Sequence, residues 1–112
     1  MISRDDVRGW ALALPEAEEA GHHGIPSFRV GGKIFCTIHL DHPRAMVKLD
    51  PEDQHNWTAG RPDAVEAVPG GWGRKGSTFV SLEWADKDLM TTLLSLAWSR
   101  VAPKRLQLGG RS

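Results

Sequence analysis

The sequence predicts an α+β fold: an antiparallel sheet of about five strands, with the first and last helices packed on one face. Helical and two-residue hydrophobic periodicities follow one another along the 112 residues. Tight-turn signals, rather than long crossovers, separate most of the strand-like segments, which favours antiparallel pairing. The length, with 40% hydrophobic and 25% charged residues, suits a single domain over residues 1–112.

The first helix begins after Ser3, because a serine N-cap followed by Asp6 is a helix-start pattern. Its apolar residues recur at helical spacing: Val7, Trp10, Ala11 and Leu14. Pro15 ends this helix. Residues 16–24 are mostly polar and contain two glycines, so we expect a loop there.

Two strands flank Gly31-Gly32, which is a two-residue hairpin signal. The first strand contains Phe28 and Val30. The second is the clearest strand of the chain, and its apolar positions alternate with the others: Ile34, Cys36, Ile38 and Leu40 against Lys33, Phe35, Thr37 and His39. We therefore expect Ile34, Cys36 and Ile38 to face the core.

A third strand follows the turn Asp41-His42-Pro43, with alternating apolar residues at Ala45, Val47 and Leu49. The other side of the sheet should carry polar and basic side chains: Arg29, Lys33, Thr37, His39, Arg44 and Lys48. Asp50-Pro51 then predicts the start of a short helix, which Gly60-Arg61-Pro62 breaks. A weak strand over 64–68 comes next.

The last third of the chain contains a strand over 78–84 and a final helix capped by Asp86. This helix has one apolar stripe: Met90, Leu93, Leu94, Ala97 and Val101. Pro103 stops it. Three tryptophans in regular elements are expected to anchor the core: Trp10, Trp84 and Trp98. Trp57 and Trp72 are expected to be freer.

A glycine-rich segment, residues 70–76, precedes the last strand and carries Trp72, Arg74 and Lys75. We expect a flexible tip, because glycine permits backbone conformations that other residues resist. Two interpretations stay open. The cations contact phosphate groups while Trp72 stacks on a ligand, or the tip is an ordinary hairpin whose tryptophan folds back on the sheet.

Composition and charge argue against several classes of function. The net charge of zero produces no global attraction to nucleic acid or to a membrane. The one cysteine, Cys36, excludes an intrachain disulfide and lies in an apolar alternation, which indicates a core thiol. The His22-His23 pair lacks a third ligand at a recognised spacing. We therefore expect no enzyme, no cofactor and no metal, and a cytoplasmic location with no apolar run that could span a bilayer.

Three segments together resemble the YjbR/MmcQ-like family of small bacterial proteins: residues 24–35, residues 71–76 and residues 97–106. The resemblance implies a frataxin-like (CyaY-like) fold, called a double wing. It also implies a DNA-binding role, with double-stranded DNA as partner and nonspecific contacts to phosphates. A departure from the pattern is Ser77, where a larger, often aromatic, residue is expected.

The residues expected to contact nucleic acid come from two sources. The resemblance points to basic positions in its three segments: Lys33, Arg74, Lys75, Lys104 and Arg105. The strand alternation adds Arg29 and Lys48, and Trp72 adds a ring for stacking. The alternative is a module that binds a small molecule or a protein partner on the open face of the sheet.

Overall fold

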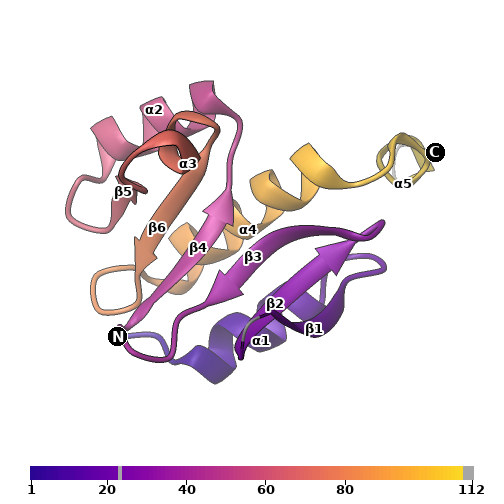
Figure 1. Cartoon of the computed structure of the whole chain (residues 1–112), viewed down its shortest axis with the longest axis horizontal. Coiled ribbons are helices and arrows are strands. Elements are labelled where there is room, and N and C mark those ends of the chain that lie inside the picture. Colours follow the sequence, from indigo (N-terminus) through magenta and orange to yellow (C-terminus); the bar gives the residue numbers. More distant parts are fainter. Residues whose placement is uncertain (23, 110–112) are drawn as a thin grey trace.

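The computed structural model describes residues 1–22 and 24–109 (Figure 1). Over these residues the fold is α+β, with a six-stranded antiparallel sheet in the order β1-β2-β3-β4-β6-β5. The strands are β1 (Glu18–His22), β2 (Ile25–Val30), β3 (Lys33–Ile38), β4 (Arg44–Lys48), β5 (Val65–Ala67) and β6 (Ser77–Ser81). The helices are α1 (Arg4–Leu12), α2 (Pro51–Gly60), α3 (Gly71–Arg74), α4 (Lys87–Val101) and α5 (Lys104–Gly109).

The first long helix, α1, and the last long helix, α4, cover one face of the sheet, as the sequence predicts. Figure 1 shows both helices behind the strands, and α4 packs against β3 and β4. The predicted stripe of α4 is buried at Met90, Leu93, Leu94 and Ala97. Within the described residues, neither of these helices lies on the opposite face of the sheet, which is left open.

Side-chain caps begin the three longest helices, as the sequence predicts. Ser3 and Asp6 exchange hydrogen bonds between their side chains and backbone N–H groups, both at 2.9 Å, which forms a capping box at α1. Asp50 accepts from the Glu52 backbone N–H at 3.0 Å. Asp86 accepts from the Leu89 backbone N–H at 2.8 Å. These local signals could be read from sequence because each involves residues two or three positions apart.

The expectation of a loop over residues 16–24 is wrong, because β1 (Glu18–His22) forms there. It pairs with β2, with Glu18 opposite Arg29 and Ala20 opposite Ser27. β1 is the edge strand of the sheet and does not need to bury a row of apolar side chains. Because its residues are mostly polar, their pattern does not indicate a strand. The backbone groups of β2, rather than its own side chains, determine that this segment is extended.

A β-bulge in β3 reverses the predicted facing of Lys33, Ile34 and Phe35. Lys33, expected on the open face, pairs instead with Val30, which is buried on the helix-covered side. Cys36 pairs with Phe28 and Ile34 pairs with Arg29, so Phe35 is the extra residue between two successive pairs. Phe35 is completely buried, and Ile34 lies on the open face. The prediction of Ile34 in the core is therefore wrong, because the strict two-residue alternation stops at the bulge. Cys36 and Ile38 are buried as predicted.

Two further predictions about the C-terminal third need correction. Strand β6 ends at Ser81, and Trp84 lies in a turn with 64% of its surface exposed, so it does not anchor the core. Pro103 does end α4, but α5 follows it at once. Trp98 is buried as expected, and its indole N–H donates to the Pro15 carbonyl at 3.0 Å.

The burial of Cys36 predicts a slow reaction with thiol reagents. Desolvation raises the pKa of this thiol to about 12, so the reactive thiolate is scarce at neutral pH. We expect labelling of the native protein to be far slower than labelling in denaturant. A Ser95→Cys variant, with its new thiol on the exposed side of α4, is the control and should gain one rapidly labelled site. Rapid native labelling of Cys36 would contradict its place beneath the sheet.

Candidate functional site

The glycine-rich segment forms the single helical turn α3, and two of its glycines, Gly73 and Gly76, are tightly packed. A Cβ on Gly73 would lie 1.7 Å from the Val68 carbonyl oxygen, and a Cβ on Gly76 would lie 1.9 Å from the Leu49 carbonyl oxygen. The Gln54 side chain of α2 donates to the Gly73 carbonyl at 2.9 Å. The expectation of a flexible tip is therefore wrong: these glycines are needed for close packing, and α3 presents its side chains from a fixed turn.

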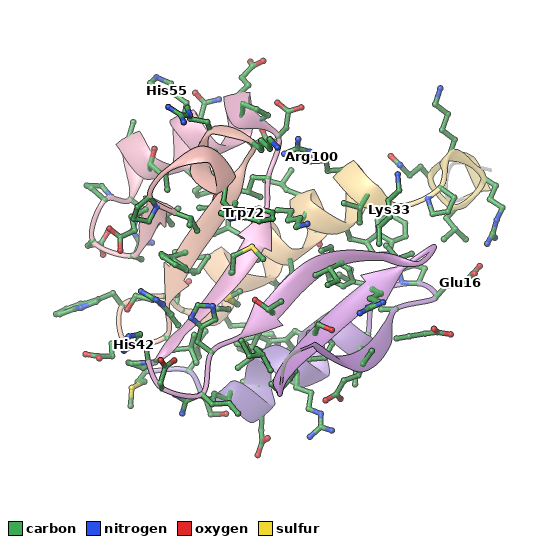
Figure 2. All side chains as sticks on the ribbon, in the orientation of Figure 1. Glu16, Lys33, His42, His55, Trp72 and Arg100 are labelled. Atoms are coloured by element: carbon green, nitrogen blue, oxygen red, sulfur yellow. The ribbon has the colours of Figure 1, made fainter. Side chains whose placement is uncertain are left out.

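The eight predicted site residues do not form one surface. Four lie on or beside the open face near α3: Lys48, Trp72, Arg74 and Lys75. Three lie at the other end of the molecule, where the β2–β3 hairpin meets the start of α5: Lys33, Lys104 and Arg105 (Figures 1 and 2). A Cβ on Gly31 of this hairpin would lie 2.8 Å from the Pro103 Cγ atom, which shows how closely the two segments pack.

The charge of Arg105 is offset by an acid. Its guanidinium donates to both carboxylate oxygens of Glu16, at 3.1 and 3.2 Å. The hydrogen bond from Arg105 lowers the pKa of the Glu16 carboxyl below its usual value, so this pair stays ionised at neutral pH. Glu16 has a positive φ of 55°, which is uncommon for a side chain of this kind. The bidentate pair therefore links the segment after α1 to α5 rather than leaving Arg105 for a ligand.

Arg29 lies on the open face in the middle of β2. Its cross-strand partners are Glu18 on β1 and Ile34 on β3. The Nε atom is buried and has no hydrogen-bond partner in the described part of the chain. An acid directly opposite reduces the positive potential that Arg29 contributes to this face.

The open face contains a hollow of about 460 Å³, which we call the open-face hollow. It lies over β3, β4 and β6, and α3 and the end of β5 form its rim. Its lining residues are Ile34, Thr37, His39, Met46, Lys48, Val68, Trp72, Ser77 and Phe79. Strand alternation predicted the outward facing of Thr37, His39 and Lys48. It could also have indicated Phe79, which alternates with the buried Thr78 and Val80.

Arg44, His39 and Phe79 form a fixed group at one side of the hollow. The Arg44 guanidinium carbon lies 3.8 Å from the centre of the Phe79 ring. The Arg44 Nε–H donates to His39 Nδ1 at 3.0 Å, and the His39 and Phe79 rings meet edge to face at 5.4 Å. Burial first, and then the charge of Arg44, lower the pKa of His39, so its imidazole is mostly neutral at pH 7.

Trp72 lines the hollow and is nevertheless 69% exposed. Figure 2 shows it in front of β4, near the middle of the open face. The interpretation of an ordinary hairpin is wrong, because residues 71–74 form α3, but the position of Trp72 over the sheet agrees with the tryptophan folding back. An exposed indole beside an apolar hollow offers a large surface to a ligand at little cost in conformational entropy.

Neither a metal-binding cluster nor a membrane-spanning helix is found among the described residues. Within the part of the chain that the structure describes, no three His, Cys, Asp or Glu residues are grouped so that they could hold a metal ion. The His22-His23 pair includes His23, which lies outside the described residues. No described helix is long and apolar enough to cross a bilayer.

The fold and the hollow define a class: a small α+β protein with one helix-covered sheet face and one open face. The family model named YjbR matches residues 12–100, and the chain therefore belongs to the YjbR family. No curated protein matches the sequence. A solved structure with the same fold is the Deinococcus radiodurans protein DR2400, of the domain family DUF419. It has a TM-score of 0.76 and 22% identity, over 90% of this chain and 79% of that one.

Proposed function

We propose that this YjbR-family protein is a binding module without catalytic activity, and that its ligand occupies the open-face hollow. The observation that carries the proposal is Trp72, exposed over a hollow whose walls are mostly apolar side chains. Ligand sites typically combine such walls with a few polar groups, and their volumes are roughly 300–1,000 Å³. A hollow of about 460 Å³ is within that range.

The distribution of charge favours this proposal over a continuous basic surface. Arg29 lies opposite Glu18, Arg105 pairs with Glu16, and Arg44 is held against Phe79 and His39. The remaining predicted cations are divided between the α3 end and the hairpin end of the molecule. Nucleic-acid binders usually concentrate positive charge on one face, and the net charge here is zero.

The chemistry of the lining residues supports binding rather than catalysis. His39 could act as a base only if its Nδ1 were released from the Arg44 N–H at 3.0 Å. The one thiol, Cys36, is completely buried on the helix-covered side of the sheet. A nucleophile and a base within hydrogen-bond reach, which covalent catalysis requires, are therefore not found among the described residues that line the hollow.

A fragment screen by amide and indole NMR tests the proposal. We expect bound compounds to shift the signals of the lining residues and of the Trp72 indole. Trp72→Ala should weaken this binding at least tenfold, by analogy with aromatic anchors at interfaces. Trp84→Ala is the matched control, since Trp84 is 64% exposed but does not line the hollow, and it should leave binding unchanged. Equal losses in both variants, or shifts outside the hollow only, would contradict the proposal.

A second function, nonspecific binding of double-stranded DNA, is favoured by a different observation. Arg74 and Lys75 follow Trp72 within the same turn, and both are exposed. No ion pair joins either of them to an acid within the described residues. We propose that, if the protein binds DNA, these two side chains contact phosphates rather than bases. Although the turn that carries them is fixed, their exposed ends are not held in the bidentate geometry that base recognition needs.

The double variant Arg74→Ala/Lys75→Ala tests this second function. Its plot of log affinity against log salt should be flatter by roughly two units, about one for each lost phosphate contact. The loss should be similar for unrelated duplexes, measured by fluorescence titration at several salt concentrations. Arg105→Ala is the control, because Glu16 already neutralises that cation, and its slope should match the wild type. An absence of salt-dependent binding in the wild type would overturn the second function and leave the hollow as the site.

A further inference from the structure

We propose that the ligand of the open-face hollow is a small aromatic anion: a planar ring that packs against Trp72, bearing a carboxylate or phosphate that pairs with Lys48. This inference rests on the proposed function and narrows it to one ligand chemistry. It follows from which lining groups are available for contact, from the sign of the charge in the hollow, and from the strand register that places these groups.

The preference for a ring follows from the two aromatic side chains of the hollow. Phe79 already has the Arg44 guanidinium over its ring at 3.8 Å and the edge of His39 beside it. It is thus held as part of the wall. Trp72 is 69% exposed, so its indole is available for stacking. A planar ligand gains both apolar burial and offset stacking there, whereas an aliphatic one gains burial alone.

The sign of the charge follows from Lys48. It is the cation among the described lining residues, and none of them is Asp or Glu. His39 adds no full charge, because burial and Arg44 keep its imidazole mostly neutral at pH 7. Lys48 is half-buried beside Met46 and Ile34 in a mostly apolar hollow, where charge pairs are stronger than in bulk water. Outside the lining, Glu66 on β5 lies opposite Phe79 and Arg44 lies over the Phe79 ring, so these two opposite charges offset each other. Lys48 therefore sets the sign of the charge, and an anion is favoured over a cation.

The strand register places the polar groups beside the apolar ones. Lys48 pairs directly with Ser77 across β4 and β6. Two residues away on each strand, Met46 pairs with Phe79, and Met46 also pairs with Thr37 on β3. The Lys48 ammonium and the Ser77 hydroxyl thus form one row. The next row contains Phe79, Met46 and Thr37 and is apolar except for the Thr37 hydroxyl. A ligand with a ring at one end and an anion at the other matches these two adjacent rows.

Three compounds with the same ring test the charge preference: indole, indole-3-acetate and tryptamine, followed by NMR shifts of the lining residues. We expect indole-3-acetate to bind about tenfold more tightly than indole, as one charge-assisted hydrogen bond allows. Tryptamine should bind more weakly than indole. Adenosine and AMP repeat the comparison with a phosphate. The gain in affinity of AMP over adenosine is then compared with the gain of indole-3-acetate over indole. The larger gain identifies the preferred anion as a phosphate or a carboxylate, and a gain in either pair supports the proposal.

Variants of Lys48 assign the preference to this residue. Lys48→Gln should abolish the tenfold difference between indole-3-acetate and indole, and Lys48→Arg should retain the difference. Lys75→Gln is the matched control, because Lys75 is exposed and does not line the hollow. A thermal unfolding midpoint that is unchanged in Lys48→Gln would show that the variant is folded.

The outcomes separate this inference from the proposed function. Equal affinities for the three indoles, with shifts in the hollow, would overturn the anion preference and leave the hollow as a binding site. Binding of non-aromatic fragments in the hollow without any binding of the ring compounds would overturn the aromatic class alone. If no compound of either set shifts the lining residues, both the inference and the proposed function fail.

Discussion

Replacing Gly76 with alanine is expected to destabilise the fold by about 3 kcal/mol or more, since two penalties act at this residue. Its φ of 109° is a conformation that residues with a side chain rarely adopt. A Cβ atom there would also lie 1.9 Å from the Leu49 carbonyl oxygen and 2.1 Å from an Arg100 guanidinium nitrogen. Urea denaturation of wild type and variant measures the difference in the free energy of unfolding.

Other glycines separate these two penalties. Gly70 has a φ of 83° and open space around its Cβ position. The loss of stability in Gly70→Ala therefore measures the cost of the backbone conformation without a steric clash. The loss of stability in Gly73→Ala measures the cost of the steric clash alone, because the new Cβ atom would lie 1.7 Å from the Val68 carbonyl oxygen. Gly9→Ala, at an exposed site in α1, should stabilise the protein by up to about 1 kcal/mol. Gly76→Ala with a stability equal to wild type would mean that Gly76 does not pack against Leu49 as described.

Truncation of Leu94 to alanine is expected to destabilise the protein by roughly 2–5 kcal/mol, the range for a buried leucine that leaves a cavity. Leu94 lies in the middle of the α4 stripe with only 1% of its surface exposed. Leu40→Ala is the control with the same chemical change, because Leu40 is 59% exposed and should change stability by less than about 0.5 kcal/mol. Similar denaturation midpoints for both variants would contradict the packing of α4 on the sheet.

When a residue that lines the hollow is replaced, a loss of ligand affinity has to be distinguished from a loss of folding. Trp72 and Lys48 are at least partly exposed and line the hollow, whereas Gly76 and Leu94 are buried. Variants of the first pair should therefore change binding with little effect on stability, and variants of the second pair should do the reverse. The Gln54 side chain, which donates to the Gly73 and Ser77 carbonyls, connects the two properties because it holds α3 beside the hollow.

Local signals in the sequence were sufficient for the α+β class, the capped starts of α1, α2 and α4, and the Gly31-Gly32 turn. Each depends on residues close together in the chain, whose spacing itself favours one conformation. The apolar stripe of α4 was equally legible, because burial of a helix face requires a regular repeat. The outward facing of Lys48 followed from the same reasoning applied to β4, where no bulge interrupts the alternation.

The tertiary structure alone decided the features that depend on partners distant in sequence. Strand β1 is extended because β2 offers it unpaired backbone groups, and the bulge at Phe35 turns Ile34 toward the open face. Gly73 of α3 is packed against Val68, and Gly76 after it against Leu49, contacts that no local pattern encodes. The hollow exists because Trp72 and strands distant in sequence meet over one surface. The helices and strands that form the hollow are determined largely by local sequence. Which side chains line it depends on how those elements pack together in three dimensions.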